Sequence, residues 1–221
     1  MKDHSKFHRL NLPGVPEQLQ GVVAIGQNAS RHGLAPHELE QLFNWVLPGS
    51  AVVRNVGGQP VVRGSGLHIS LSHAEGLTAL ALAPFPVGID VERIDPEFDV
   101  LEFDPDLFGV QDFRELETCE ASLRSDHFYR LWTLKEAHLK RQGRSLLCDR
   151  LPNVSGAPSM STAWMVRPTG RYCVGVNWQA PVTSDLPPRP APGAFSEWRL
   201  PQKPTAAAEG ARAISECVIH I

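Results

Sequence analysis

Three short apolar segments follow one another closely along the chain, at residues 68–73, 77–82 and 87–91. The first alternates polar and apolar residues, as His-Ile-Ser-Leu-Ser-His, and this period of two is typical of a half-buried strand. Ala74-Glu75-Gly76 predicts a three-residue hairpin connection to the second segment. Pro84 and Pro86 predict a hinge before the third segment. The sequence therefore predicts a group of strands with short connections, the first two paired as a hairpin.

A helix precedes strands on each side of this hinge. Residues 34–47 place apolar side chains at helical spacing, and a short strand is expected at 51–54. Residues 126–142 form a stronger helical segment, with Ser125 suited to cap it and Gly143 suited to end it. Further strands are expected after this helix, at residues 161–166 and 171–178. The repeated order of a helix and then antiparallel strands predicts an α+β fold of two similar halves.

We expect three regions along the chain. Residues 1–85 form the predicted N-terminal half, and residues 86–180 form the predicted C-terminal half. Residues 181–221 form a proline-rich tail, in which 181–204 is expected to be loop and 206–215 a short helix.

The overall composition argues against several classes of function. The net charge is -3 over 221 residues, which gives no reason to expect broad attraction to nucleic acid or to a membrane surface. The four cysteines form no CxxC pair, so neither a zinc site nor a redox motif is indicated. The first residues lack the apolar segment of a secretory signal, and the most apolar stretch, 77–87, is too short to span a bilayer. We therefore expect a cytoplasmic protein.

Gly88-Ile89-Asp90-Val91-Glu92 is the most informative of the predicted strands. Positions two apart project from the same face of a strand, so Asp90 and Glu92 point together while their apolar neighbours enter the core. Two adjacent carboxylates raise each other's proton affinity, and a divalent cation removes that penalty. Mg²⁺ favours oxygen ligands and commonly bridges to substrate phosphates. The alternative is an edge strand whose polar face is acidic without any bound metal.

The helix predicted at 126–142 carries a second polar group. Trp132, Glu136 and Lys140 share one face because they are spaced four residues apart. Leucines at 131, 134 and 139 supply the opposite, apolar side. Glu136 is therefore a candidate third metal ligand, and Lys140 is a candidate phosphate contact. The alternative is a surface ion pair between Glu136 and Lys140, worth a few tenths of a kcal/mol.

Together, these two motifs resemble the paired signatures of the surfactin-type (Sfp-type) 4′-phosphopantetheinyl transferases. The second motif, Phe-Tyr-Arg-Leu-Trp-Thr-Leu-Lys-Glu-Ala-His-Leu-Lys at 128–140, follows the first in the family's order, and the resemblance covers residues 57–146. It implies transfer of the 4′-phosphopantetheine moiety of coenzyme A to a serine of an apo acyl or peptidyl carrier protein, with release of 3′,5′-ADP. It also implies a monomer built as a pseudo-dimer of two α/β halves with antiparallel sheets, with coenzyme A in the cleft between them.

The resemblance further implies the catalytic roles. Asp90, Glu92 and Glu136 match the ligands of Mg²⁺, which also touches the coenzyme A pyrophosphate. Glu136 matches the residue proposed as general base towards the carrier serine. Lys140 matches the lysine that binds the pyrophosphate and assists the transfer. Since the nucleophile comes from the carrier, the enzyme needs no nucleophilic Ser-His-Asp set of its own.

Cofactor binding is implied for four residues, Ser72, His73, Lys135 and Lys140. Ser72 and His73 resemble a Ser-His pair that contacts coenzyme A phosphate, with His73 near the 3′-phosphate. The N-terminal half would supply this pair, and the C-terminal half would supply the metal and the catalytic helix. Asp112 falls where the family often has a glutamate, and the sequence leaves its role open.

The chain also departs from the family pattern. Gly58-Gln59-Pro60 stands where relatives usually show Gly-Lys-Pro, so one basic cofactor contact is missing. The N-terminal third lacks the arginine-rich helix that is common in relatives. The nearby candidates to replace those charges are Arg31, His32, Arg54 and Arg63. These losses predict weaker coenzyme A binding or a shifted specificity.

Three other functions remain open from the sequence. A degenerate relative would bind coenzyme A or a carrier protein without transferring the arm. Another magnesium-dependent phosphotransferase is the second alternative, although the absence of a glycine-rich phosphate loop counts against enzymes that use nucleoside triphosphates. A purely structural adaptor is the third, and it would leave the carboxylate pair without a purpose.

Overall fold

The structure is a computed structural model, and it describes part of the chain. The described residues are 7–11, 22–27, 34, 36–46, 49, 51–54, 59–64, 66–144, 151–154, 160–166, 171–179 and 196–198.

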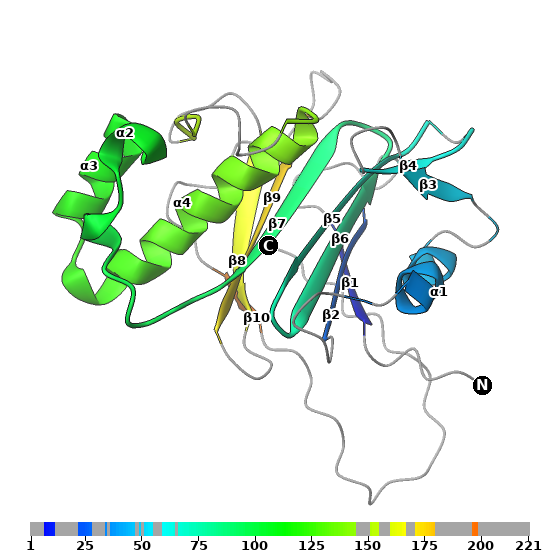
Figure 1. Cartoon of the computed structure of the whole chain (residues 1–221), viewed down its shortest axis with the longest axis horizontal. Helices are drawn as coiled ribbons and strands as arrows, with labels where there is room; N and C mark the ends of the chain where they lie inside the picture. The colour runs from blue at the N-terminus through cyan, green and yellow to red at the C-terminus, as the bar shows by residue number, and fades with distance from the viewer. Residues whose placement is uncertain are drawn as a thin grey trace, which may run out of the picture.

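Two four-stranded sheets form the centre of the molecule (Figure 1). The first has the strand order β1-β2-β6-β5 and is antiparallel throughout; its strands are Phe7–Asn11 (β1), Val22–Gln27 (β2), His68–Ala74 (β5) and Leu77–Ala83 (β6). The second has the order β10-β8-β9-β7; its strands are Val87–Arg93 (β7), Met160–Val166 (β8), Tyr172–Trp178 (β9) and Ser196–Trp198 (β10). Within it only β10 pairs in parallel, with β8. A small ladder joins Val52–Arg54 (β3) to Pro60–Val62 (β4).

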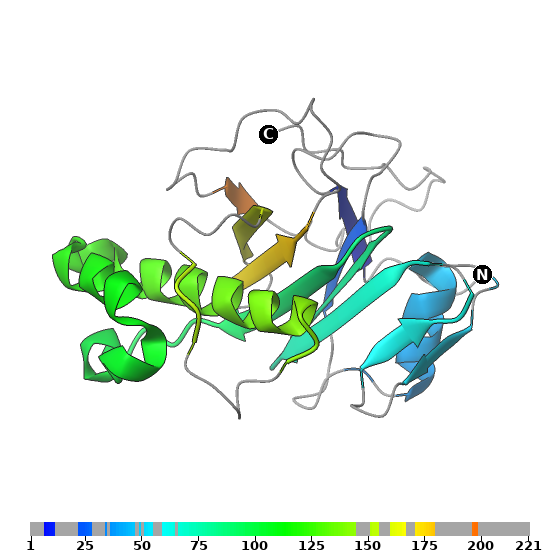
Figure 2. The same ribbon diagram turned by 90° about the horizontal axis from the view of Figure 1, so that it is seen from above.

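The helices cover different sheets, as the two views show (Figures 1 and 2). Pro36–Val46 (α1) packs on the first sheet, where Leu42 meets Leu80 and Leu82 of β6. Ala121–Arg141 (α4) lies along the second sheet, next to Pro105–Phe108 (α2) and Val110–Thr118 (α3). A 3₁₀ turn at Val100–Glu102 precedes α2. None of the helices in the described ranges is long and apolar enough to cross a membrane.

One apolar core is shared by the two sheets. It contains alternate residues of β6, β7 and β9, among them Ala79, Ile89 and Val174. Because strand residues alternate between faces, the opposite face of β7 carries Asp90 and Glu92 and is turned towards α4. The neighbouring face of β9 places Cys173 in a second core with the helices. The period of two expected for residues 87–91 is therefore confirmed.

Two glycines allow α4 to lie directly on this polar face. A Cβ atom on Gly88 would stand 1.9 Å from the carbonyl oxygen of Ala137. A Cβ atom on Gly175 would stand 2.6 Å from the carbonyl carbon of Thr133. Neither position has room for a side chain, so the helix backbone approaches the sheet more closely than ordinary side-chain packing allows. This close approach brings Glu136 within reach of β7.

The two sheets meet at their edge strands, β5 and β7. Serine side chains connect these edges: the backbone N–H of Ile89 donates to Ser70 Oγ at 3.1 Å, and the N–H of Val91 donates to Ser72 Oγ at 3.4 Å. The two serines of the alternating segment 68–73 thus accept hydrogen bonds from backbone donors of β7. The hairpin between β5 and β6 is confirmed, but its turn is the two residues Glu75 and Gly76, because Ala74 still pairs with Leu77.

The structure corrects the predicted start of the long helix. The helix begins at Ala121, and Ser125 lies inside it, half-buried, with a hydroxyl oxygen that has no hydrogen-bond partner among the described residues. The preceding residue, Glu120, makes no side-chain cap. Instead, Arg124 donates to the backbone oxygens of Leu116 and Cys119 and so ties the first turn of α4 to the end of α3. The predicted end is confirmed, since Gly143 follows the helix with φ of +72°.

Several elements have no counterpart in the sequence prediction. These are β1, β2, β4, α2, α3 and β10. The prediction that 181–204 is entirely loop is wrong at β10, which adds a strand to the exposed edge of β8. The helix predicted at 206–215 lies outside the described residues.

Candidate active site

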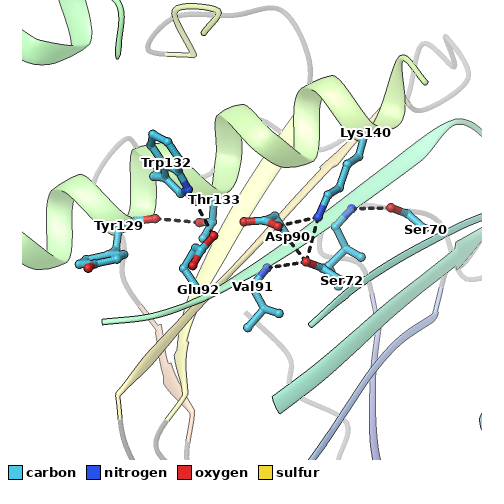
Figure 3. A network of polar contacts seen from close by, with 10 residues as sticks. Ser70, Ser72, Asp90, Val91, Glu92, Tyr129, Trp132, Thr133 and Lys140 are labelled. Atoms are coloured by element: carbon cyan, nitrogen blue, oxygen red, sulfur yellow. Dashed lines mark hydrogen bonds and ion pairs between the residues drawn. The ribbon is translucent and has the colours of Figure 1, made fainter. Parts of the chain in front are cut away.

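Three carboxylates from two separate elements come together between β7 and α4. Asp90 and Glu92 extend from β7, and Glu136 extends from α4 (Figure 3 shows the two strand residues). One oxygen atom of each lies within 4.8 Å of the oxygens of the other two. Asp90 and Glu136 are buried, and Glu92 is half-buried. The structure therefore brings together the three acidic residues that the sequence singled out.

Burial makes this acidic group costly to ionise. Burial, with the nearby Asp90 carboxylate as the second cause, raises the pKa of Glu136 to about 8. The same two causes, in the same order, raise the pKa of Glu92 to about 7. Asp90 Oδ2 is buried and has no hydrogen-bond partner among the described residues. An unpartnered buried acceptor next to two carboxyl groups with raised pKa values is a donor set that fits a divalent cation, because carboxylate oxygens are ligands that Mg²⁺ prefers.

Lys140 and Ser72 contact the acidic group at Asp90. Lys140 Nζ donates to Asp90 Oδ1 at 2.6 Å and to Ser72 Oγ at 2.8 Å. Ser72 Oγ donates to Asp90 Oδ1 at 2.8 Å and accepts from the N–H of Val91 (Figure 3). A hydroxyl has one proton and two lone pairs, so these contacts use the full capacity of Ser72. Ser72 therefore orients Asp90 and Lys140 rather than offering its hydroxyl to a ligand.

Trp132 contacts the acidic group at Glu92. Its indole Nε1–H donates to Glu92 Oε1 at 3.4 Å (Figure 3). Trp132, Glu136 and Lys140 all face β7, as their spacing predicted. Lys140 contacts Asp90 on the neighbouring strand, and therefore the alternative of a simple surface ion pair between Glu136 and Lys140 does not describe this helix face.

The structure corrects the prediction that Lys135 contacts the cofactor. Lys135 is fully buried on another side of α4, where it forms an ion pair with Asp112 of α3. Its ammonium also donates to the carbonyl oxygen of Pro152 at 2.7 Å and lies 4.7 Å from the centre of the Phe108 ring. Asp112 accepts in addition from the N–H of Val154 at 3.0 Å. Both residues thus connect α4 to its neighbours, away from the three carboxylates.

His73 and the residues around the missing basic contact lie apart from the three carboxylates in the fold or at the end of α4. His73 is exposed on the face of β5 opposite to Ser72, in line with Ile69 and Leu71. Gln59 lies near the end of α4, because its Oε1 would be 3.8 Å from a Cβ atom on Gly143. Of the four basic candidates, Arg63 is exposed, whereas Arg31, His32 and the side chain of Arg54 lie outside the described residues.

A pocket that the sequence does not indicate adjoins the carboxylates. The pocket has a volume of about 190 Å³ and is lined by Glu92, Phe98, Phe103, Phe128, Tyr129 and Trp132. Phenylalanines recur every five residues at 98, 103, 108 and 113, a spacing that matches neither a strand nor a helix. Their clustering becomes apparent only when a turn and two short helices fold them against α4.

Comparison with known proteins connects this site to one family. Residues 86–164 match the family described as the 4′-phosphopantetheinyl transferase superfamily. The 4′-phosphopantetheinyl transferase psf-1 of Bacillus pumilus is 34% identical over 126 residues, which is 55% of this chain and 50% of the relative.

Two further relatives match over shorter segments. The 4′-phosphopantetheinyl transferase gsp of Aneurinibacillus migulanus is 30% identical over 93 residues, covering 42% of this chain and 38% of the relative. The 4′-phosphopantetheinyl transferase Sfp of Bacillus subtilis is 30% identical over 79 residues, covering 36% and 34%. The matched segments thus span half or less of the length of these curated relatives.

Proposed function

We propose that this chain, which belongs to the 4′-phosphopantetheinyl transferase superfamily through residues 86–164, transfers the phosphopantetheine arm of coenzyme A to a serine of an apo acyl or peptidyl carrier protein. The observation that carries the proposal is the meeting of Asp90, Glu92 and Glu136, with their oxygens within 4.8 Å, beside the ammonium of Lys140. The matched residues include all four of these side chains.

Asp90, Glu92 and Glu136 are the proposed ligands of Mg²⁺. The unpartnered Asp90 Oδ2 and the raised pKa values of Glu92 and Glu136 support this proposal, because a divalent cation would satisfy all three. When bound, the ion would neutralise the carboxylates together with the pyrophosphate of coenzyme A. The dependence of transfer on Mg²⁺ is part of the proposal.

The reaction is a phosphoryl transfer in which the protein positions its substrates and neutralises charge. The serine oxygen of the carrier forms a bond to the β-phosphorus, and the bond from that phosphorus to 3′,5′-ADP breaks. Lys140 would stabilise the negative charge of the pyrophosphate, since its ammonium lies beside the carboxylate of Asp90. Glu136 would accept the serine proton, directly or through a water molecule. His73 remains a proposed contact to the 3′-phosphate.

The proposed site lies where two halves of the chain meet. The order β2, α1, β5, β6 recurs as β7, α4, β8, β9, and in both sheets the last strand lies between the other two. This likeness supports the proposal of a pseudo-dimer with its boundary between β6 and β7, near Pro84 and Pro86. A monomer located in the cytoplasm, where coenzyme A is available, is the state that we propose.

Intact-mass measurement of a carrier protein tests the transfer. The protein is mixed with an apo carrier, coenzyme A and Mg²⁺, and we expect the carrier to gain the mass of one phosphopantetheinyl group. Asp90→Ala and Glu136→Ala should abolish the gain while circular dichroism shows an intact fold. Binding of coenzyme A without a mass gain on any of several acyl and peptidyl carriers would favour a non-catalytic relative. Wild-type rates in either variant would refute the metal assignment.

A further inference from the structure

The aromatic pocket lies at the opposite end of the site from Lys140. Trp132 and Lys140 are eight residues apart on α4, which corresponds to about 12 Å along a helix. Figure 3 shows Trp132 and Glu92 on one side of Asp90, and Lys140 with Ser72 on the other. The lysine end suits a phosphate, whereas the pocket end has aromatic walls and one carboxylate. The two ends are therefore chemically suited to different substrates.

Exposed apolar side chains are concentrated in the segment that supplies Phe98 and Phe103 to the pocket. Among the described residues, the large apolar side chains that are exposed are Val61, Phe98, Leu101, Leu107, Val110 and Leu123. All but Val61 come from residues 98–123, the part of the chain that runs from Phe98 through the 3₁₀ turn, α2 and α3 to the first turn of α4. Phe98 belongs to both groups, because it lines the pocket and is 37% exposed. An exposed phenylalanine at a pocket offers apolar surface that a partner protein can cover.

Residues 94–106, which include the turn beside the pocket, carry charge of one sign. Their acidic residues are all exposed, and they are Asp95, Glu97, Asp99, Glu102, Asp104 and Asp106. Residues 94–113 contain no lysine, arginine or histidine. Protein partners dock where their potentials are complementary, so this rim favours a basic partner and repels an acidic one.

We propose that this pocket docks an apolar side chain of the carrier protein, and that the acidic rim selects carriers with basic residues beside the acceptor serine. The inference rests on the proposed transferase function. The pocket touches the site through Glu92, so a carrier anchored there would bring its serine to the carboxylates while coenzyme A occupies the lysine end. Phe98 and Glu102 are specificity residues in this arrangement.

The test uses one apo carrier in two forms, with two surface positions beside the serine changed to lysine or to glutamate. At low salt we expect the wild-type enzyme to modify the lysine form with a kcat/KM about tenfold higher. High salt should reduce the difference because it screens exposed charges. The double variant Glu97→Lys, Glu102→Lys should remove the preference, while the remote Glu40→Lys on α1 should keep it.

The pocket is tested by Phe98→Ser. We expect its KM for the carrier to rise several-fold with little change in the KM for coenzyme A, whereas Val61→Ser, at a similarly exposed site on β4, should change neither. Equal or reversed preference by an active wild-type enzyme, or an unchanged carrier KM in Phe98→Ser, would overturn the docking inference alone. A wild-type enzyme that modifies neither carrier form would contradict the proposed function as well.

Discussion

Glu136 shows how a single side chain can serve the site at a cost to the fold. Its carboxyl group is buried near Asp90 and Glu92, and only Lys140 and Trp132 lower its pKa in return. The folded chain therefore binds a proton at Glu136 more tightly than the unfolded chain does. In the absence of metal, ionisation of this group should weaken the fold.

The raised pKa of Glu136 makes the stability of the metal-free protein depend on pH. Because the pKa of Glu136 rises from 4.5 to about 8 on folding, the metal-free protein should lose stability as pH increases between these values. Glu136→Gln removes this loss, so we expect it to exceed the wild type in free energy of unfolding by on the order of 2 kcal/mol at pH 8.5 and by little at pH 5. Urea unfolding with a chelator at both pH values measures this. An equal difference at the two pH values would contradict the assigned burial.

The sequence indicated that Glu136 faces the carboxylates of β7, but it did not indicate the partner of Lys135. Lys135 and Glu136 are neighbours in the chain but lie about 100° apart around the helix axis. One packs against Asp112, and the other faces β7. The spacing of four residues indicated that Trp132, Glu136 and Lys140 share one face of the helix. Only the packing of α2 and α3 shows that Lys135 is enclosed.

At the scale of the elements, the contact of α4 with β7 is what assembles the site. We predict that Gly88→Ala destabilises the protein by about 3 kcal/mol, because the new methyl group would meet the helix backbone 1.9 Å away. Magnesium binding should weaken with it, since Glu136 would move away from β7. Thermal unfolding and calorimetry measure the two effects.

Gly66→Ala is the matched control for this variant. Gly66 has open space around it and a φ of +66°, so the change should cost only about 1 kcal/mol of backbone strain and leave metal binding intact. Equal effects of the two substitutions on metal affinity would show that the close packing at Gly88 is not needed.

A further prediction concerns the ion pair between Lys135 and Asp112. Lys135→Met leaves a buried carboxylate without its ammonium, and we expect a loss of about 3–5 kcal/mol. The double variant Asp112→Leu, Lys135→Met removes both charges and should recover most of that stability. Denaturant unfolding of the two variants distinguishes this outcome from a simple loss of packing, in which the double variant would be the less stable of the two.

The regular elements around the site were predictable, because β5 and β7 alternate, α4 has helical spacing, and β6 is a short apolar run that follows a turn. The start of α4 was not, since it depends on Arg124 reaching the end of α3 rather than on a local cap. β1 and β2 were also missed. Ten residues separate them, too many for a tight hairpin turn although Pro13-Gly14 lies among them, and β2 is recognised by its pairing with β1 and β6.

At the scale of the whole molecule, the site depends on two sheet edges that meet. The sequence indicated two halves and a hinge, but nothing local indicates that Ser70 and Ser72 would bond to the backbone of β7. These serines reach Ile89 and Val91 across nineteen positions in the chain. The alternation of residues 68–73 correctly predicted a strand, while the meeting of the edges is a property of the complete fold.

Position 59 carries glutamine where relatives usually have lysine, and this difference predicts an effect on coenzyme A affinity. Gln59 lies near the end of α4, just beyond Lys140, so a positive charge there would add to the phosphate end of the site. We expect Gln59→Lys to tighten coenzyme A binding by roughly threefold to tenfold at low salt, whereas Gln59→Met should not. Calorimetry measures the change. An unchanged or weaker affinity in Gln59→Lys would show that this position does not face the cofactor.

Calorimetric titration of coenzyme A with and without Mg²⁺ shows whether the three carboxylates hold a metal ion at the cofactor. If Asp90, Glu92 and Glu136 hold the ion against the pyrophosphate, Mg²⁺ should tighten coenzyme A binding by at least about tenfold, and coenzyme A should tighten Mg²⁺ binding by the same factor. Glu136→Gln should lose this coupling and keep its fold. Equal coenzyme A affinity with and without Mg²⁺ in the wild type, or full coupling in Glu136→Gln, would contradict the account.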